Sequence, residues 1–304
     1  MEKLNRRDFF AGSGFAAAGA LAALGAAAGR AEAAPEQTGS SAGKKFKISL
    51  AGWSINSTFR KEWTCLDLPR IVREEFGLDG LEFVNSHFDL PLFGYLKDLK
   101  QRAADYGVEL VLIMCDNEGD MSSEDKQERM QAAINHRKWV DIAHFLGCHA
   151  IRGNFGYTKA GTAEERIARC AESYRSLVEY ADTAGMNVLI ENHGGLSSYP
   201  ETVVSLMKLV NHPRFGTLPD FGNFAPEVDK YQAIEALMPW AKAVSVKCVD
   251  FEPDGSHPAW DLDRMVEIVL AAGYRGFFGI EAGSRQGRHK ENVLACKALL
   301  ERHR

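Results

Sequence analysis

The sequence lacks the features that mark several common classes of protein. Its six cysteines lie far apart without any C-x-x-C spacing, so most are expected to be small core residues. Basic residues do not exceed acidic ones, 36 against 41, which argues against a nucleic-acid partner. No linker or shift in composition interrupts residues 46–304, so we expect one large domain with a well-buried core.

The one long run of small residues lies at the start of the chain, at residues 11–29. Recurring glycines and few strong hydrophobes make it a poor membrane anchor, although its length would suffice for one. Arg6-Arg7 precede the run, and Ala31-Glu32-Ala33 follows it as a small-x-small cleavage site. We therefore predict a twin-arginine signal peptide at 1–33, carried by the twin-arginine translocase, and a periplasmic or otherwise exported protein without a stable membrane anchor.

Loss of that signal would leave 32 basic and 38 acidic residues, a net charge near −6. Residues 34–45 are rich in glycine, serine and glutamine, and we expect them to form a flexible tether.

From residue 46 the chain repeats a short apolar run followed by a longer segment with helical spacing. Glycines fall where several of these helices should stop before the next strand, at Gly77, Gly107, Gly147, Gly185 and Gly273. The eight predicted strands are residues 47–52, 78–84, 109–115, 148–152, 187–191, 216–220, 243–249 and 277–281.

Eight strands that alternate with helices predict an α/β fold, a single (β/α)8 TIM barrel over residues 46–304. An open doubly wound sheet is the main alternative. It would usually carry a glycine-rich phosphate loop after its first strand, and Ser49-Leu50-Ala51-Gly52-Trp53-Ser54 is not such a loop.

Acidic residues end three of the late strands, namely Glu191, Asp220 and Glu281. In a barrel these side chains would meet at the mouth, where three carboxylates repel one another unless a cation or shared protons compensate. Oxygen ligands suit Mg²⁺ or Mn²⁺ better than Zn²⁺. Salt bridges with Arg152 and Lys247 are the alternative explanation for the same acids.

Several segments together resemble the xylose-isomerase-like TIM barrels, a group of sugar isomerases, sugar epimerases and endonuclease IV, and more closely its exported members described as sugar phosphate isomerases or epimerases. The segments that carry the resemblance are Leu50-Ala51-Gly52-Trp53-Ser54, Ile151-Arg152-Gly153-Asn154, Ile190-Glu191-Asn192-His193-Gly194-Gly195, Leu218-Pro219-Asp220-Phe221-Gly222-Asn223-Phe224, Val244-Ser245-Val246-Lys247 and Gly279-Ile280-Glu281.

The resemblance implies a divalent cation held by Glu191, Asp220 and Glu281, with manganese or magnesium favoured over zinc. The group's fourth ligand, a histidine on strand seven, is replaced here by Ser245. Water or His193 could take the place of this fourth ligand, or the metal could bind weakly. The histidine-rich cluster and basic face of the endonucleases are absent, so nucleic acid is again not expected as a partner.

We predict a sugar isomerase or epimerase that moves a proton of a ketose or related carbohydrate through an enediolate. Glu191 and Glu281 would exchange the proton, and Lys247 would stabilise an oxyanion, act as a base if its pKa is lowered, or only pair with a carboxylate. The residues expected to bind the small carbohydrate substrate are Trp53, Glu82, Arg152, Asn154, His193 and Asn223.

Two other functions fit the same residues. A lyase would eliminate a leaving group from a keto-sugar or 3-keto-glycoside, and a non-catalytic barrel would only bind sugar. The sequence is also compatible with a homo-oligomer and does not fix the number of subunits.

Overall fold

The computed structural model describes residues 45–57, 59 and 61–304. The predicted signal peptide, and all of the predicted tether except Lys45, lie outside the described residues. Within the described part, no helix is long and apolar enough to cross a membrane.

Eight parallel strands form the centre of the described part of the fold. Their bounds are β1 (Lys47–Ala51), β2 (Gly80–Val84), β3 (Glu109–Met114), β4 (Ala150–Gly153), β5 (Asn187–Glu191), β6 (Phe215–Leu218), β7 (Val244–Val249) and β8 (Phe277–Gly283). They pair in the order β6-β5-β4-β3-β2-β1-β8-β7. The two outer strands meet through backbone hydrogen bonds, from Ser245 N to Pro219 O (2.9 Å) and from Phe221 N to Ser245 O (3.1 Å). These bonds close the sheet, so the predicted (β/α)8 barrel is confirmed.

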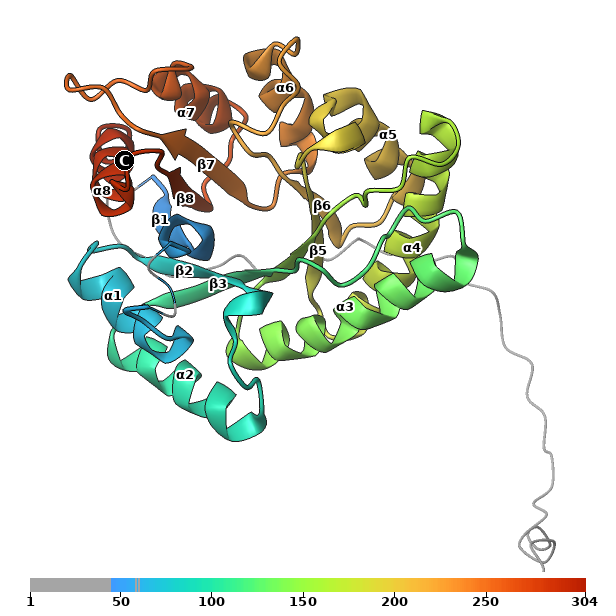
Figure 1. Ribbon diagram of the computed structural model, residues 1–304, viewed down its shortest axis with the longest axis horizontal. Coiled ribbons are helices and arrows are strands. Elements are labelled where there is room, and N and C mark those ends of the chain that lie inside the picture. Colours follow the sequence, from blue (N-terminus) through green and yellow to red (C-terminus); the bar gives the residue numbers. More distant parts are fainter. Residues whose placement is uncertain (1–44, 58, 60) are drawn as a thin grey trace, which may run out of the picture. The chain divides into compact units, whose positions relative to one another are not determined.

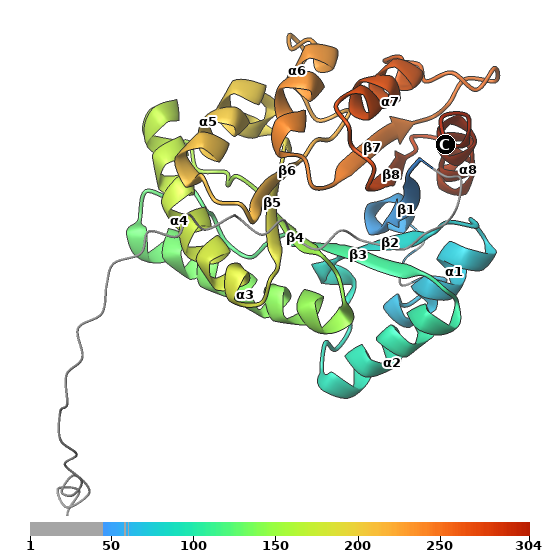
Figure 2. The ribbon, with the colours of Figure 1, turned by 180° about the vertical axis from the view of Figure 1, so that it is seen from behind.

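Helices follow the strands and lie on the outside of the curled sheet (Figure 1). Their bounds are α1 (Leu68–Glu74), α2 (Phe93–Asp105), α3 (Lys126–Leu146), α4 (Ala163–Thr183), α5 (Pro200–Val210), α6 (Lys230–Leu237), α7 (Leu262–Ala271) and α8 (His289–Glu301). The view from behind shows β4 between β3 and β5, with α3 and α4 beside them (Figure 2).

The helix ends follow from the local sequence. The Asp125 carboxylate accepts hydrogen bonds from the backbone of Gln127 and Glu128, which satisfies two free N–H groups at the start of α3. Gly147 ends the same helix with φ of 90°, a conformation that is strained for residues with a Cβ. Each of the other four predicted stop glycines also has a positive φ.

The strands are buried on both faces, as parallel strands covered by helices usually are. Val188, Leu189 and Ile190 in β5, for example, have no exposed surface. All six cysteines are free and buried, which agrees with their predicted role as small core residues.

One charged side chain lies inside the barrel itself. Glu82 of β2 is 2% exposed and accepts a hydrogen bond of 2.5 Å from Ser49 Oγ of β1. Its carboxylate fills the space beside Gly279 of β8, where an added Cβ would lie 2.3 Å from Oε1. Burial raises the pKa of Glu82 to about 7, against its ordinary value of 4.5, so the neutral acid is favoured in the folded protein.

Because the folded state holds the Glu82 proton more tightly than the unfolded state does, this residue should make stability fall as pH rises from 4.5 to 7. The full effect is roughly 3 kcal/mol, reached above pH 7. We therefore expect Glu82→Gln to have a free energy of unfolding close to that of the wild type at pH 4.5 and a higher one at pH 8. Urea titrations across this range, in buffer with chelator, would measure the difference. Parallel stability curves for the two proteins would show that Glu82 is not the cause.

Candidate active site

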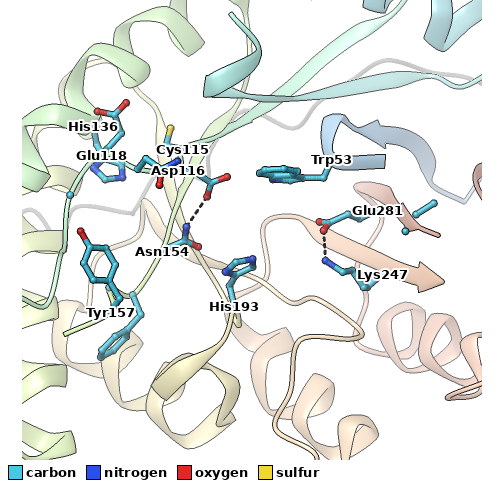
Figure 3. Close-up of a pocket in the computed structure, with 16 residues that line it drawn as sticks. Trp53, Cys115, Asp116, Glu118, His136, Asn154, Tyr157, His193, Lys247 and Glu281 are labelled. Carbon is cyan, nitrogen blue, oxygen red and sulfur yellow. Dashed lines mark hydrogen bonds and ion pairs between the residues drawn. The ribbon is translucent and has the colours of Figure 1, made fainter. Parts of the chain in front are cut away.

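Polar side chains from the strand ends meet at a cavity of about 620 Å³. The predicted residues Trp53, Asn154, His193, Lys247 and Glu281 all line it. Figure 3 shows them on different sides of one hollow, with Lys247 pointing at Glu281 and Asn154 at Asp116. The barrel thus gathers residues that are up to about 230 positions apart in the sequence, as carboxyl strand ends do in this fold.

Glu191, Asp220 and Glu281 form a compact cluster at the strand ends, in which Glu281 lines the cavity and Glu191 and Asp220 are not among its lining residues. Each residue offers a carboxylate oxygen, and the three oxygens lie within 4.8 Å of one another. The residues are 1%, 0% and 7% exposed, so water screens their mutual repulsion poorly. The three acids therefore lie close together, as predicted.

The Asp220 carboxylate is fixed by neutral donors. Its Oδ1 accepts hydrogen bonds of 2.8 Å from the backbone N–H groups of Gly222 and Asn223. Its Oδ2 accepts a bond of 2.7 Å from Ser245 Oγ, which also lies 3.3 Å from Glu281 Oε2. Ser245 therefore links two of the three acids.

The Glu191 carboxylate is held from two sides. Asn223 Nδ2 donates to Oε1 at 3.0 Å. Arg152 Nε lies 2.9 Å from Oε2 in a fully buried ion pair, while Arg152 Nη1 donates to Asp116 Oδ1 at 2.7 Å. The Arg152 contact does not have the angles of a hydrogen bond, so Glu191 Oε2 is a buried oxygen without a hydrogen-bond donor among the described residues.

The Glu281 carboxylate pairs with Lys247, whose ammonium group donates to Oε1. Burial works against the charge on Lys247, but Asp220 and Glu281 outweigh it and raise the pKa of the ammonium group. The condition on which Lys247 was expected to act as a base, a lowered pKa, is therefore not met, and its neighbours favour the cation.

Two members of the cluster hold protons unusually well. Burial, opposed by Arg152 and reinforced by Glu281, raises the pKa of Glu191 to about 7. Burial also raises the pKa of Asp220 to about 7, against the effect of Lys247. Both acids therefore lie near the middle of their titration at neutral pH, when only protein groups surround them.

The cluster is suited to a metal ion. Among the described residues, these three are the one group of His, Cys, Asp or Glu side chains found close enough together to hold an ion. Carboxylate oxygens are the ligands that Mg²⁺ and Mn²⁺ prefer, and Glu191 Oε2 has a lone pair without a donor. The three residues could hold a divalent cation, and His193 is not close enough to join them as a fourth ligand in this arrangement.

The remaining predicted substrate-binding residues do not all line the cavity. Arg152 and Asn223 contact Glu191 directly and do not line the cavity, so they support the cluster from behind. His193 lines the cavity, and burial followed by Arg152 lowers its pKa, which favours the neutral imidazole. Glu82 lies within the barrel and is not among the lining residues.

Sequence reasoning did not select four residues that line the same cavity, Asp116, Glu118, His136 and Tyr157. Asp116 lies two residues after the end of β3, so its position near a strand end was a usable signal. His136 lies within α3, where a histidine predicts nothing by itself, and only the packing of α3 against β4 turns it toward the cavity.

Two comparisons place this architecture among known proteins, and a third finds nothing similar. A search among curated proteins finds no match. A 3-keto-D-glucoside 4-epimerase from Escherichia coli has a similar structure, with a TM-score of 0.68 and 15% identity over 84% of this chain and 99% of that one. An L-ribulose 3-epimerase gives 0.68 and 17% over 84% and 93%. A probable 3-DHS dehydratase from Bacillus anthracis gives 0.63 and 17% over 84% and 99%.

At these identities the similar structures establish the fold alone. The family model described as a xylose isomerase-like TIM barrel matches residues 72–300, which is most of the barrel. The chain therefore belongs to the xylose isomerase-like TIM barrel family.

Proposed function

We propose that the protein is a divalent-metal-dependent isomerase or epimerase of a ketose or related carbohydrate. The observation that carries the proposal is the cluster of three buried carboxylates with oxygens within 4.8 Å of one another. Sugar epimerases among the structurally similar proteins are consistent with this activity.

The charges around the cluster favour an added cation. Four carboxylates contact one another through shared partners, those of Asp116, Glu191, Asp220 and Glu281, whereas Lys247 and Arg152 supply only two positive charges. When all four acids are ionised, a divalent ion would balance the difference. Bound there, it would supply Lewis acidity that polarises a carbonyl and acidifies the neighbouring C–H bond.

The protein's own groups would move the proton. Glu191 would remove the proton as a carboxylate, because a bound cation would keep this buried acid ionised. Glu281 lines the cavity from β8 and would have to enter this step protonated; it would give its proton to the planar carbon while Glu191 keeps the one it removed, and exchange with solvent would restore both acids. Asn223 and Arg152 would keep the Glu191 carboxylate in one orientation during both transfers.

Lys247 would act as a fixed positive charge. Its ammonium group lines the cavity beside Glu281, where it can donate to a substrate oxygen on which negative charge develops. Its raised pKa keeps it protonated throughout catalysis, so it would stabilise charge and would not abstract the proton.

Elimination is a second candidate, because the same ammonium group could donate to a departing oxygen. Lys247 is the cation that lines the cavity next to a catalytic carboxylate, which is the arrangement a lyase needs. Chromatography of the products from a 3-keto-glycoside would distinguish the two reactions, since elimination releases the second part of the glycoside and epimerisation does not.

Removal of either proton-transfer group should stop exchange at the substrate carbon. We expect Glu191→Gln and Glu281→Gln each to lower deuterium incorporation from heavy water by at least about 100-fold, because general acid–base catalysis contributes that much. Nuclear magnetic resonance of D-fructose and methyl 3-keto-α-D-glucoside would follow the exchange. Glu267→Gln, on the exposed surface of α7, is the control and should exchange normally. Undiminished exchange in both site variants would contradict the assigned roles.

Loss of one ligand should also release the cation. Protein purified without chelator should retain about one equivalent of manganese or magnesium, and Asp220→Asn should retain less than about a tenth of it. Mass spectrometry of the metal content measures this without reference to activity. Glu267→Gln again serves as the control. A wild-type protein free of divalent ions after dialysis against manganese would refute the metal site.

A further inference from the structure

The cavity is larger than one sugar ring requires. A six-carbon sugar packed at the density of a protein interior fills on the order of 200 Å³, whereas the cavity holds about 620 Å³. Ten of its sixteen lining residues come from the loops after β3 and β4 and from α3, and none of the ten belongs to the cluster of Glu191, Asp220 and Glu281. Figure 3 shows Glu118, His136 and Tyr157 on one side and Trp53, Lys247 and Glu281 on the other.

The loop after β3 forms a firm wall at the outer end. Glu118 Oε1 accepts hydrogen bonds from Trp139 Nε1 (2.5 Å) and Asn85 Nδ2 (3.1 Å), and Oε2 pairs with Lys138 at 2.8 Å. Gly119 packs so closely on α3 that an added Cβ would lie 2.8 Å from Ala132 Cβ. The outer end is therefore a built surface whose polar groups are already paired.

Tyr157 is presented at the rim of this wall. Its side chain is 74% exposed, although large aromatic side chains are usually buried. Its backbone is nevertheless fixed, because the N–H groups of Tyr157 and Thr158 both donate to Asp120 Oδ2, at 3.2 and 2.7 Å. Gly156, with φ of 115°, brings the loop so close that an added Cβ would lie 2.1 Å from Asp120 Oδ1.

Acceptors for hydroxyl groups lie between the rim and the cluster. Asp116 Oδ1 accepts hydrogen bonds from Arg152 and Asn154. Its Oδ2 accepts none from the residues that the structure describes. His136 is 2% exposed and its Nδ1 bonds the Ala132 carbonyl at 2.8 Å, which leaves Nε2 as an acceptor at the cavity wall. Burial lowers the pKa of His136, so its ring stays neutral.

From these features we infer an outer subsite, made by Asp116, Glu118, His136, Gly156 and Tyr157, that binds the second ring of a glycoside. The Tyr157 ring would stack on the apolar face of that second ring, while Asp116 and His136 accept from its hydroxyl groups. The outer subsite rests on the proposed function of the carboxylate cluster. The substrate would then be a keto-sugar joined to a second ring through a glycosidic bond.

Matched pairs of one-ring and two-ring sugars test the subsite by calorimetric binding. D-fructose is compared with maltulose, lactulose and isomaltulose, and methyl 3-keto-α-D-glucoside with 3-ketosucrose. In the holoenzyme, at least one two-ring probe should bind about tenfold more tightly than its one-ring partner. Tyr157→Ala should reduce that preference to less than about threefold and leave one-ring binding unchanged, while Tyr157→Phe keeps the ring and the preference.

A wild-type protein that prefers no two-ring probe would overturn the outer subsite. An equal loss of affinity for one-ring and two-ring sugars in Tyr157→Ala would also overturn it. Solvent exchange distinguishes this failure from a failure of the proposed function. Exchange without any two-ring preference would contradict the subsite alone. A two-ring preference that depends on Tyr157, in a protein that exchanges no substrate proton, would support the subsite and contradict the proposed chemistry.

Discussion

The repulsion among three buried carboxylates is the constraint on which the rest of the site depends. Glu191, Asp220 and Glu281 are nearly inaccessible to water, yet their oxygens lie within 4.8 Å of one another. Unlike an exposed acidic patch, such a cluster must be compensated by fixed groups or by a bound cation. Arg152 and Lys247 supply part of that compensation, but burial and then the neighbouring Glu281 still raise the pKa values of Glu191 and Asp220 to about 7.

The barrel and the position of the acids could be read from the sequence because both depend on local patterns. Short apolar runs and stop glycines mark the strand and helix limits to within a few residues, and β5 has the predicted bounds. Since parallel strands end at the same mouth, residues that terminate strands had to approach one another. Arg152 and Lys247 do form ion pairs with Glu191 and Glu281, two of the three carboxylates that could hold a cation.

The pairing between side chains could not be predicted from the sequence. The chain of contacts from Asp116 through Arg152 to Glu191 depends on the register of β3, β4 and β5, which no local pattern specifies. The charge state of Lys247 depends likewise on the distances to its acidic neighbours. Ser245 was recognised as a departure from the family pattern, but its role as a bridge between Asp220 and Glu281 required coordinates.

Lys247 and Glu281 line one side of the cavity and residues of the loops after β3 and β4 line the other, so the proposed chemistry would be confined to the side of Glu281. Crystals grown with Mn²⁺ and measured at an energy where manganese scatters anomalously would show whether a cation binds among the three carboxylates. We expect one anomalous peak about 2.2 Å from an oxygen of each of Glu191, Asp220 and Glu281. A map without that peak, in which only the Lys247 ammonium group or water lies among the three carboxylates, would contradict this expectation.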